Sequence, residues 1–403
     1  MHHKFGAFLF FKSVVLSVDI LYNTNMNKSL GIYVHIPFCE KKCDYCNFVS
    51  YCPPKQTQVE YAKSVIREVQ MQGPKFKDYK VDTIFFGGGT PSCMPDGTIS
   101  MILQSIYQNF SVKKDAEITI ECNPNSLTVA KLNEYKKVGI NRLSIGLQAY
   151  SNKLLKLIGR LHKKEQFDEV FSLARDMGFK NINVDLILGL PRQTLCNVKR
   201  ELHHLKRLNV EHISAYGLIV EENTKLSKNL QQKVYKLPSE DKQLKMYRYT
   251  KKYLEKNGIF RYEVSNFAKK GFECEHNKKY WTEKEYLGIG AVASSFANGE
   301  RWKNTDNIKK YIDDISKNKV EREEVEQIDK QNMIEETIML SLRTVAGIDL
   351  SKFENDFGVN ILKDKKTEIA ELQKQQLIQI EDDHLYCTDR GFEVLNQIVL
   401  QLV

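Results

Sequence analysis

Three cysteines with metal-ligand spacing lie near the start of the chain, at Cys39, Cys43 and Cys46. Structural zinc usually takes four ligands in two separated pairs. No fourth cysteine follows at a matching distance, because position 48 is Phe48 and Cys52 lies beyond it. A [4Fe–4S] cluster takes one thiolate per iron. The three thiolates therefore predict such a cluster, with one iron open to a small-molecule ligand.

Other candidate groups follow further along the chain. The run Gly87–Gly89 allows the backbone to approach a ligand closely and to present N–H and C=O groups, although a tight turn would need the same residues. Glu121 and Asp185 are candidates to bind an ammonium group or ribose hydroxyls; elsewhere, such carboxylates more often cap a helix or pair with a surface cation.

Six short β-branched runs, most of them about thirty residues apart, must position these groups. Amphipathic stretches such as Val59–Met71, Thr128–Val138, Gln166–Met177 and Val198–Leu208 lie between them. This alternation predicts a parallel sheet, and six units suit an open, partial barrel whose chemistry lies at the carboxyl ends of its strands. The predicted strands are Gly31–Ile36, Val81–Phe86, Glu117–Glu121, Arg142–Leu147, Ile182–Leu188 and His212–Leu218.

After about residue 225 the pattern changes. We expect the barrel core to span 26–225, a capping segment 226–302, a charged linker 303–330 and a small α+β domain 331–403. The last region predicts three helices, a hairpin from Leu377 to Cys387 turning at Asp382 and Asp383, and a final helix, an order typical of winged-helix folds. Its seven Lys/Arg and thirteen Asp/Glu disfavour nucleic-acid binding, so we expect a lid or docking domain.

Composition excludes several classes of protein. With 42% hydrophobic and 28% charged residues, the 403-residue chain is not disordered, fibrous or a multi-span membrane protein, and nine cysteines are too few for a disulfide scaffold.

Residues 1–25 are read as a leader or mis-called extension before Met26, as a membrane-surface anchor, or as a targeting peptide. We expect a cytoplasmic protein, and the +9 net charge allows peripheral association with the inner membrane.

The cysteine motif, followed by Gly-Gly-Gly-Thr-Pro at 87–91, resembles the radical S-adenosylmethionine (SAM) superfamily. That resemblance implies an α/β fold, a partial (β/α)6 barrel. It also implies that the amino and carboxylate groups of SAM chelate the open iron, and that reductive cleavage of SAM yields methionine and a 5′-deoxyadenosyl radical.

Four further motifs, at 33–39, 121–124, 144–148 and 185–191, resemble the coproporphyrinogen-dehydrogenase-like branch of this superfamily. The likeness extends from Leu30 to the C-terminus. It implies a SAM pocket lined by Tyr33, Tyr45, Gly88, Gly89, Thr90, Glu121, Gln148, Arg160, Asp185 and Ile219, of which Arg160 and Ile219 are matched by position rather than by motif.

Two departures separate the subfamilies of this branch. The dehydrogenase carries a further cysteine where this chain has Phe48, and a long arm before the cluster, whereas Met26 stands thirteen residues before Cys39. Both features resemble the HemW-type heme chaperones, whose motif His-Asn-x-x-Tyr-Trp occurs here at 276–281. The resemblance implies heme binding and delivery to acceptor hemoproteins, with respiratory proteins as one candidate class.

The alternative function is oxygen-independent coproporphyrinogen III dehydrogenase, which makes protoporphyrinogen IX by radical oxidative decarboxylation; no catalytic residue is assigned. His276 is the first candidate for contact with heme, since histidine is a common axial ligand. The competing interpretation is that His276 forms hydrogen bonds that order the cleft. Cys274 is a weaker candidate ligand, and His35 is expected to support the site rather than bind metal.

Overall fold

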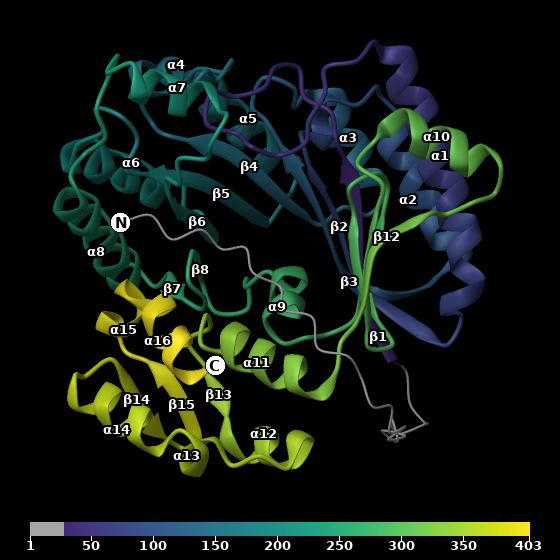
Figure 1. Ribbon diagram of the computed structural model, residues 1–403. Coiled ribbons are helices and arrows are strands. Elements are labelled where there is room, and N and C mark those ends of the chain that lie inside the picture. Colours follow the sequence, from purple (N-terminus) through teal and green to yellow (C-terminus); the bar gives the residue numbers. More distant parts are fainter. Residues whose placement is uncertain (1–27) are drawn as a thin grey trace.

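The computed structural model describes residues 28–403, so the predictions for residues 1–25 lie outside the described residues. Six parallel strands stand side by side in chain order, which confirms the predicted partial barrel (Figure 1). They are β1 (Lys28–Ile36), β2 (Tyr79–Gly88), β3 (Ser111–Cys122), β4 (Arg142–Gln148), β5 (Asn181–Leu188) and β6 (His212–Gly217).

Helices follow these strands and cover the outer face of the sheet (Figure 1). In the helix of residues 164–176, for example, Phe167, Val170, Phe171 and Ala174 recur at helical spacing and are buried. The helices are α1 (Lys55–Gln72), α2 (Thr98–Asn109), α3 (Val129–Lys137), α4 (Asn152–Leu157), α5 (Lys164–Asp176), α6 (Leu195–Arg207), α7 (Lys225–Gln231) and α8 (Glu240–Lys256); Gly73–Phe76 and Pro91–Cys93 form 3₁₀ turns.

The strands alternate between two kinds of side chain. In β4, Leu143, Ile145 and Leu147 belong to the main apolar core, whereas the residues between them line the barrel interior. Successive side chains of a strand point to opposite faces, so one face packs under the helices and the other faces inward. Parallel strands buried on both faces are usually apolar throughout. The polar inner face therefore marks an interior built to hold a ligand.

Further strands extend the sheet at both edges to twelve strands within the described part of the chain. On one side, β9 (Tyr286–Ile289) pairs parallel with β1 and is followed by antiparallel β10 (Ser294–Ala297), β11 (Glu300–Asn304) and β12 (Arg322–Gln327). On the other, β8 (Asn266–Ala268) pairs antiparallel with β6 and with β7 (Phe260–Arg261).

The predicted linker at 303–330 is wrong. These residues include the end of β11, helix α10 (Ile308–Ser316), which packs on α1, and the edge strand β12. Their polar composition has a different cause. Helix α10 buries only the narrow stripe Ile308, Tyr311 and Ile315, and charged residues on an edge strand such as β12 protect it from pairing with other chains.

The C-terminal region forms a small domain with its own apolar core. The predicted hairpin is present, and Asp382 and Asp383 adopt the positive φ angles that a tight two-residue hairpin turn requires. The elements are α11 (Lys330–Ser341), β13 (Ile348–Asp349), α12 (Leu350–Phe357), α13 (Ile361–Asp364), α14 (Lys366–Lys374), β14 (Ile378–Glu381), β15 (His384–Cys387), α15 (Asp389–Glu393) and α16 (Leu395–Leu402).

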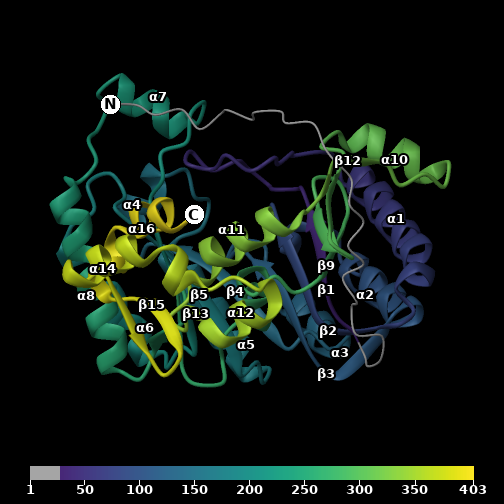
Figure 2. The ribbon, with the colours of Figure 1, turned by 60° about the horizontal axis from the view of Figure 1, so that its bottom comes forward.

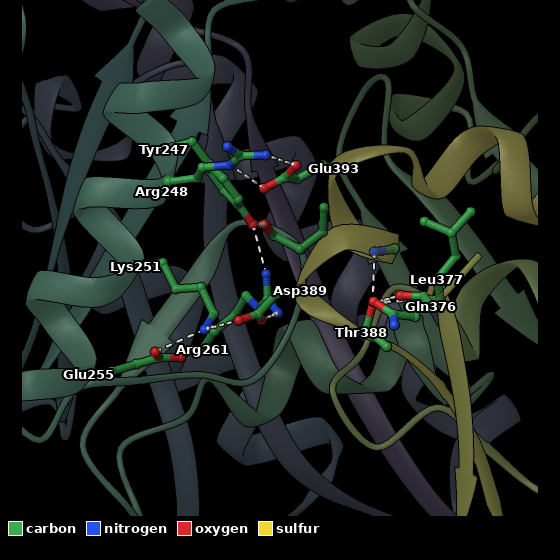
Figure 3. Close-up of polar contacts among 12 residues, drawn as sticks. Tyr247, Arg248, Lys251, Glu255, Arg261, Gln376, Leu377, Thr388, Asp389 and Glu393 are labelled. Carbon is green, nitrogen blue, oxygen red and sulfur yellow. Dashed lines mark hydrogen bonds and ion pairs between the residues drawn. The ribbon is translucent and has the colours of Figure 1, made fainter. Parts of the chain in front are cut away.

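This domain docks beside α8 and β7 through charged contacts (Figure 3). Asp389 accepts hydrogen bonds from Arg261 at 2.9 Å and from Lys251 at 2.8 Å. Arg248 donates two bonds of 2.6 Å to Glu393. In Figure 2, which brings this end forward, α11 lies in front of the strands, where it packs against helix α9 (Glu275–Trp281). Within residues 28–403, no helix is long and apolar enough to cross a membrane.

Replacing Asp389 with alanine is expected to loosen this docking. Arg261 is buried and would lose the only carboxylate partner that it has among residues 28–403, and hydrogen bonds to charged groups are worth about 1.5–3 kcal/mol before solvent exposure of Asp389 reduces the figure. We expect the free energy of unfolding, measured in urea, to fall by about 1 kcal/mol. Glu393→Ala, which frees the exposed Arg248, is the matched control and should cost less; an equal loss would contradict a special role for Arg261.

Candidate functional site

All fourteen residues predicted to bind metal or cofactor line one cavity of about 650 Å³. The cavity occupies the interior of the barrel and includes the carboxyl ends of several strands. The predicted residues that it brings together are Cys39, Cys43 and Cys46 with Tyr33, Tyr45, Gly88, Gly89, Thr90, Glu121, Gln148, Arg160, Asp185, Ile219 and His276.

The loop after β1 carries the three thiols, all partly buried and free of disulfides. Its backbone is held in place, since Cys39 N–H donates to the Tyr51 carbonyl at 2.9 Å and Asp44 N–H to that of Ile158 at 3.0 Å. Among residues 28–403, no three His, Cys, Asp or Glu side chains converge as a single metal ion would require. A four-iron cluster binds each thiolate at a different iron, so its ligands stand further apart.

Polar groups surround these thiols. Burial raises the pKa of Cys39 and Cys46, and bound iron would favour their thiolate forms. The hydroxyl of Thr90 lies 3.5 Å from Cys39 Sγ, and Arg160 Nη1 donates to Cys43 Sγ at 3.6 Å. Hydrogen bonds to sulfur and a nearby cation both favour a thiolate-bound cluster, so the donor set fits the cluster that the spacing predicts.

The glycine run holds the cysteine loop rather than presenting free N–H groups. Gly89 N–H donates to Ile36 O at 2.8 Å, and Thr90 N–H donates to Phe38 O at 2.7 Å. Gly88 adopts a φ of +108°, and a Cβ there would stand 2.5 Å from the His35 ring. Both the backbone angle and the close approach require glycine. The glycines therefore bring the end of β2 against the backbone of the cluster loop.

Glu121 and Asp185 face the cavity from neighbouring parts of the sheet. Burial and the charge of Asp185 raise the pKa of Glu121 to about 8, although Gly88 N–H donates to Glu121 Oε2 at 3.1 Å. Burial also raises the pKa of Asp185, which accepts a 2.7 Å hydrogen bond from Asn183. Within the described residues, neither carboxylate caps a helix or forms an ion pair. Both are therefore placed to accept hydrogen bonds from a ligand.

Arg160 connects the cluster loop to the cavity wall. Its Nη2 donates to Gly146 O at 2.8 Å and to Asn123 Oδ1, while Nη1 reaches Cys43. Arg160 was assigned to the SAM pocket by its position in the sequence alone. In the structure it lies beside the thiols of the cluster loop. At the mouth of the same cavity, Ile219 is 72% exposed and Phe48 is 70% exposed. The cavity therefore has a polar, charged interior and an apolar mouth.

His276 is buried in the cavity wall, and both of its ring nitrogens are occupied. Nδ1 bonds Thr83 Oγ1 at 2.8 Å and Nε2 bonds the Tyr280 hydroxyl at 2.9 Å. The ring stacks on Phe85 with centroids 5.2 Å apart, and burial lowers the imidazole pKa to about 3. To ligate iron, His276 would have to give up one of these bonds. The geometry favours the interpretation that it orders the cleft.

The other two weaker candidates lie outside the cavity wall. Cys274 is fully buried, bonds Glu117 Oε1 at 3.4 Å and has its thiol pKa raised to about 12 by burial. His35 accepts or donates a 3.0 Å bond with the Tyr33 hydroxyl and packs against Gly88. His35 thus supports the site, as expected, and Cys274 belongs to the structure around helix α9.

Comparison with known proteins decides the family. Residues 33–205 match the Radical SAM superfamily and residues 328–394 match the HemN C-terminal domain. The heme chaperone HemW of Lactococcus lactis is 37% identical over 93% of this chain and 97% of its own length. HemW of Bacillus subtilis is 34% identical over 91% and 97%. The chain belongs to the HemW family of radical SAM proteins.

Among solved structures, coproporphyrinogen III oxidase (HemN) from Escherichia coli superposes with a TM-score of 0.82 at 24% identity, covering 93% of this chain and 90% of that one. This likeness shows the fold. Membership of the superfamily implies a [4Fe–4S] cluster and SAM, which supply a 5′-deoxyadenosyl radical when SAM is cleaved. In this HemW-family chain, the thiol loop and the cavity carboxylates have the donor chemistry that these two groups need.

Several cavity residues were not predicted as site residues. They are polar or aromatic residues at alternate strand positions, and they share the inner face with the predicted ones: Phe85, Arg142, Ser144, Asn183, Ser214 and Tyr216. Their signal in the sequence is a polar residue at every second position of a strand that is flanked by apolar neighbours. Strands covered on both faces rarely carry that pattern unless the inner face contacts a ligand.

Gly89→Ala is expected to disrupt the cluster. An added Cβ would stand 2.6 Å from Phe38 O and 2.8 Å from Phe38 N, both backbone atoms that cannot move without shifting Cys39. Anaerobic reconstitution should give a protein with most of the visible cluster absorbance lost, approaching Cys39→Ala. Gly217→Ala, whose Cβ meets no atom within 4 Å, is the control and should reconstitute normally. Normal iron content in Gly89→Ala would contradict the role given to the glycine run.

His276→Ala is expected to destabilise the protein. It removes a stacked ring and leaves the buried Thr83 and Tyr280 hydroxyls without their partner. A loss of about 3 kcal/mol in the free energy of unfolding is typical for such a change. His203→Ala, at an exposed position on α6, serves as the control and should have little effect. Equal stability of the two variants would show that the ring is not a structural element.

Proposed function

We propose that this protein binds heme and transfers it to acceptor hemoproteins. The observation that carries the proposal is the likeness, over 97% of their own length, to proteins named heme chaperones. The heme-bound state would include the cluster and SAM, which the superfamily implies. Respiratory hemoproteins remain one candidate class of acceptor, and association with the inner membrane, where such acceptors reside, is part of the same proposal.

The mouth of the cavity supports this function. Phe48 and Ile219 are large apolar side chains that are mostly exposed, and Tyr216, which lines the same cavity, is 41% exposed. Adjacent exposed apolar side chains at a cavity commonly mark a binding site for an apolar ligand or partner. The flat faces of a porphyrin pack well on aromatic and aliphatic side chains. An apolar mouth of this kind can hold a heme that must later leave it.

The alternative, oxygen-independent coproporphyrinogen III dehydrogenase, shares the barrel with this protein. The similarity to the Escherichia coli structure is one of fold and does not separate the two functions. Phe48 occupies the position at which, by resemblance, the dehydrogenase has a further cysteine, and its exposed ring adds to the apolar mouth. Phe48 at this position therefore favours heme binding and transfer over the dehydrogenase activity.

Titration of the reconstituted protein with hemin is expected to shift the Soret band and saturate at one heme per chain. Phe48→Glu should weaken the affinity about tenfold or more, because it replaces an apolar contact with a charge. Phe260→Glu is the matched control, since Phe260 on β7 is 55% exposed and lies outside the cavity lining. Transfer is followed as recovery of the spectrum of an added apo-hemoprotein.

Two results would overturn the proposal. The first is a titration without a Soret shift in the wild-type protein. The second is anaerobic conversion of coproporphyrinogen III to protoporphyrinogen IX in the presence of reductant and SAM, which would establish the dehydrogenase instead. Equal weakening by Phe48→Glu and Phe260→Glu would show that heme binds outside the mouth of the cavity.

A further inference from the structure

Arg142 is a buried cation that has no hydrogen-bond or ion-pair partner among residues 28–403. It begins β4, is 2% exposed and lines the cavity. No described residue forms a hydrogen bond or ion pair with its guanidinium, and its Nε is buried without an acceptor. Burying a charge is costly unless it is paired and hydrogen-bonded. The protein thus maintains an unpaired arginine inside its own ligand cavity.

The groups around Arg142 compensate its charge only at a distance. Burial disfavours the charged guanidinium, whereas Cys274, Glu117 and Asp185 favour it and on balance raise the pKa of Arg142, but none of the three forms an ion pair with it. Both carboxylate oxygens of Glu117 accept bonds from the start of α9, namely from the backbone N–H groups of Glu275 and His276. Asp185 is bonded by Asn183 and Ser144. The planar donors of Arg142 are therefore left for an anion that enters the cavity.

The shape of those donors indicates a carboxylate, since the guanidinium fork matches a carboxylate with two parallel hydrogen bonds. Two ligands expected in this cavity carry one, SAM and heme. The resemblance to the radical SAM superfamily implies that the carboxylate of SAM binds the open iron of the cluster, beside the loop of Cys39. Arg142 stands at the opposite end of its strand, six residues or about 20 Å before Gln148 at the carboxyl end. Of these two ligands, heme is therefore the one whose carboxylate Arg142 can bind.

We propose that Arg142 receives one propionate of bound heme at the inner end of the cavity, with the opposite, apolar edge of the porphyrin toward the mouth. The inference rests on the proposed heme binding and adds the orientation of the ligand. Polar residues that line the same cavity, Ser144, Asn183, Ser214 and Asn277, give the carboxylate a hydrogen-bonding environment.

The test compares hemin with iron protoporphyrin dimethyl ester, which lacks the propionate charges, in the full-length protein. Arg142→Met should weaken hemin binding about tenfold or more and leave ester binding unchanged, because only the charge pair is lost. Arg142→Lys should weaken hemin binding less. Arg343→Met, in the C-terminal domain, should change neither affinity.

Other outcomes would overturn the inference. Equal weakening of hemin and ester by Arg142→Met would show that the side chain only shapes the cavity, and no weakening would place the propionates elsewhere. Loss of SAM binding with hemin affinity retained would assign Arg142 to SAM. If the wild-type protein binds neither porphyrin, the proposed function fails together with this inference; if it binds both and Arg142→Met binds hemin equally well, this inference fails alone.

Discussion

The structure depends on the two-residue period of its six central strands. At one set of positions the strands carry apolar side chains, such as Leu143 and Ile145, that pack under the helices and hold the fold together. At the other set they carry polar, charged or aromatic side chains, such as Ser144 and Asp185, that face inward. Groups of this kind are costly to bury without partners. The apolar side chains on the outer face of the barrel therefore stabilise the fold, and the polar side chains on the inner face form the candidate site. The two sets alternate along each strand because successive side chains point to opposite faces of the sheet.

Helix α9 closes the end of the barrel opposite the cluster loop, which explains His276 and Tyr280 of the His-Asn-x-x-Tyr-Trp motif without requiring an iron ligand. Glu117 accepts both N–H groups at the start of α9, His276 is fixed between Thr83 and Tyr280, and Lys279 pairs with Asp82 at 2.7 Å. A carboxylate at a helix N-terminus and buried hydrogen bonds both favour a rigid element. Because α11 packs against α9, the C-terminal domain supports this closed end, and the apolar mouth lies at the opposite end of the cavity.

The sequence was sufficient to predict those parts of the structure that depend only on residues close together in the chain. Strand cores such as Arg142–Leu147 were found from their composition, and the cluster loop from the spacing of its cysteines, because neither depends on distant residues. The segment 303–330 was not recognised, since an edge strand and an exposed helix are polar for the same reason that a linker is. The role of His276 also depends on partners 193 and 4 residues away in the chain, Thr83 and Tyr280. Arg142 was assigned to a strand, but only the structure shows that no described residue forms an ion pair with it.

Charged groups that line the cavity are held in protonation states that a bound ligand would change. Burial keeps the pKa of Glu121 near 8, so at neutral pH this carboxyl mostly retains its proton, and a cation bound beside it would lower that pKa and release the proton. Arg142 cannot respond in this way, because a guanidinium does not lose its proton in proteins. It therefore remains charged and unpaired until an anion arrives. An anion that binds there gains hydrogen bonds from donors that no described residue uses, so the guanidinium favours a ligand that carries the complementary charge.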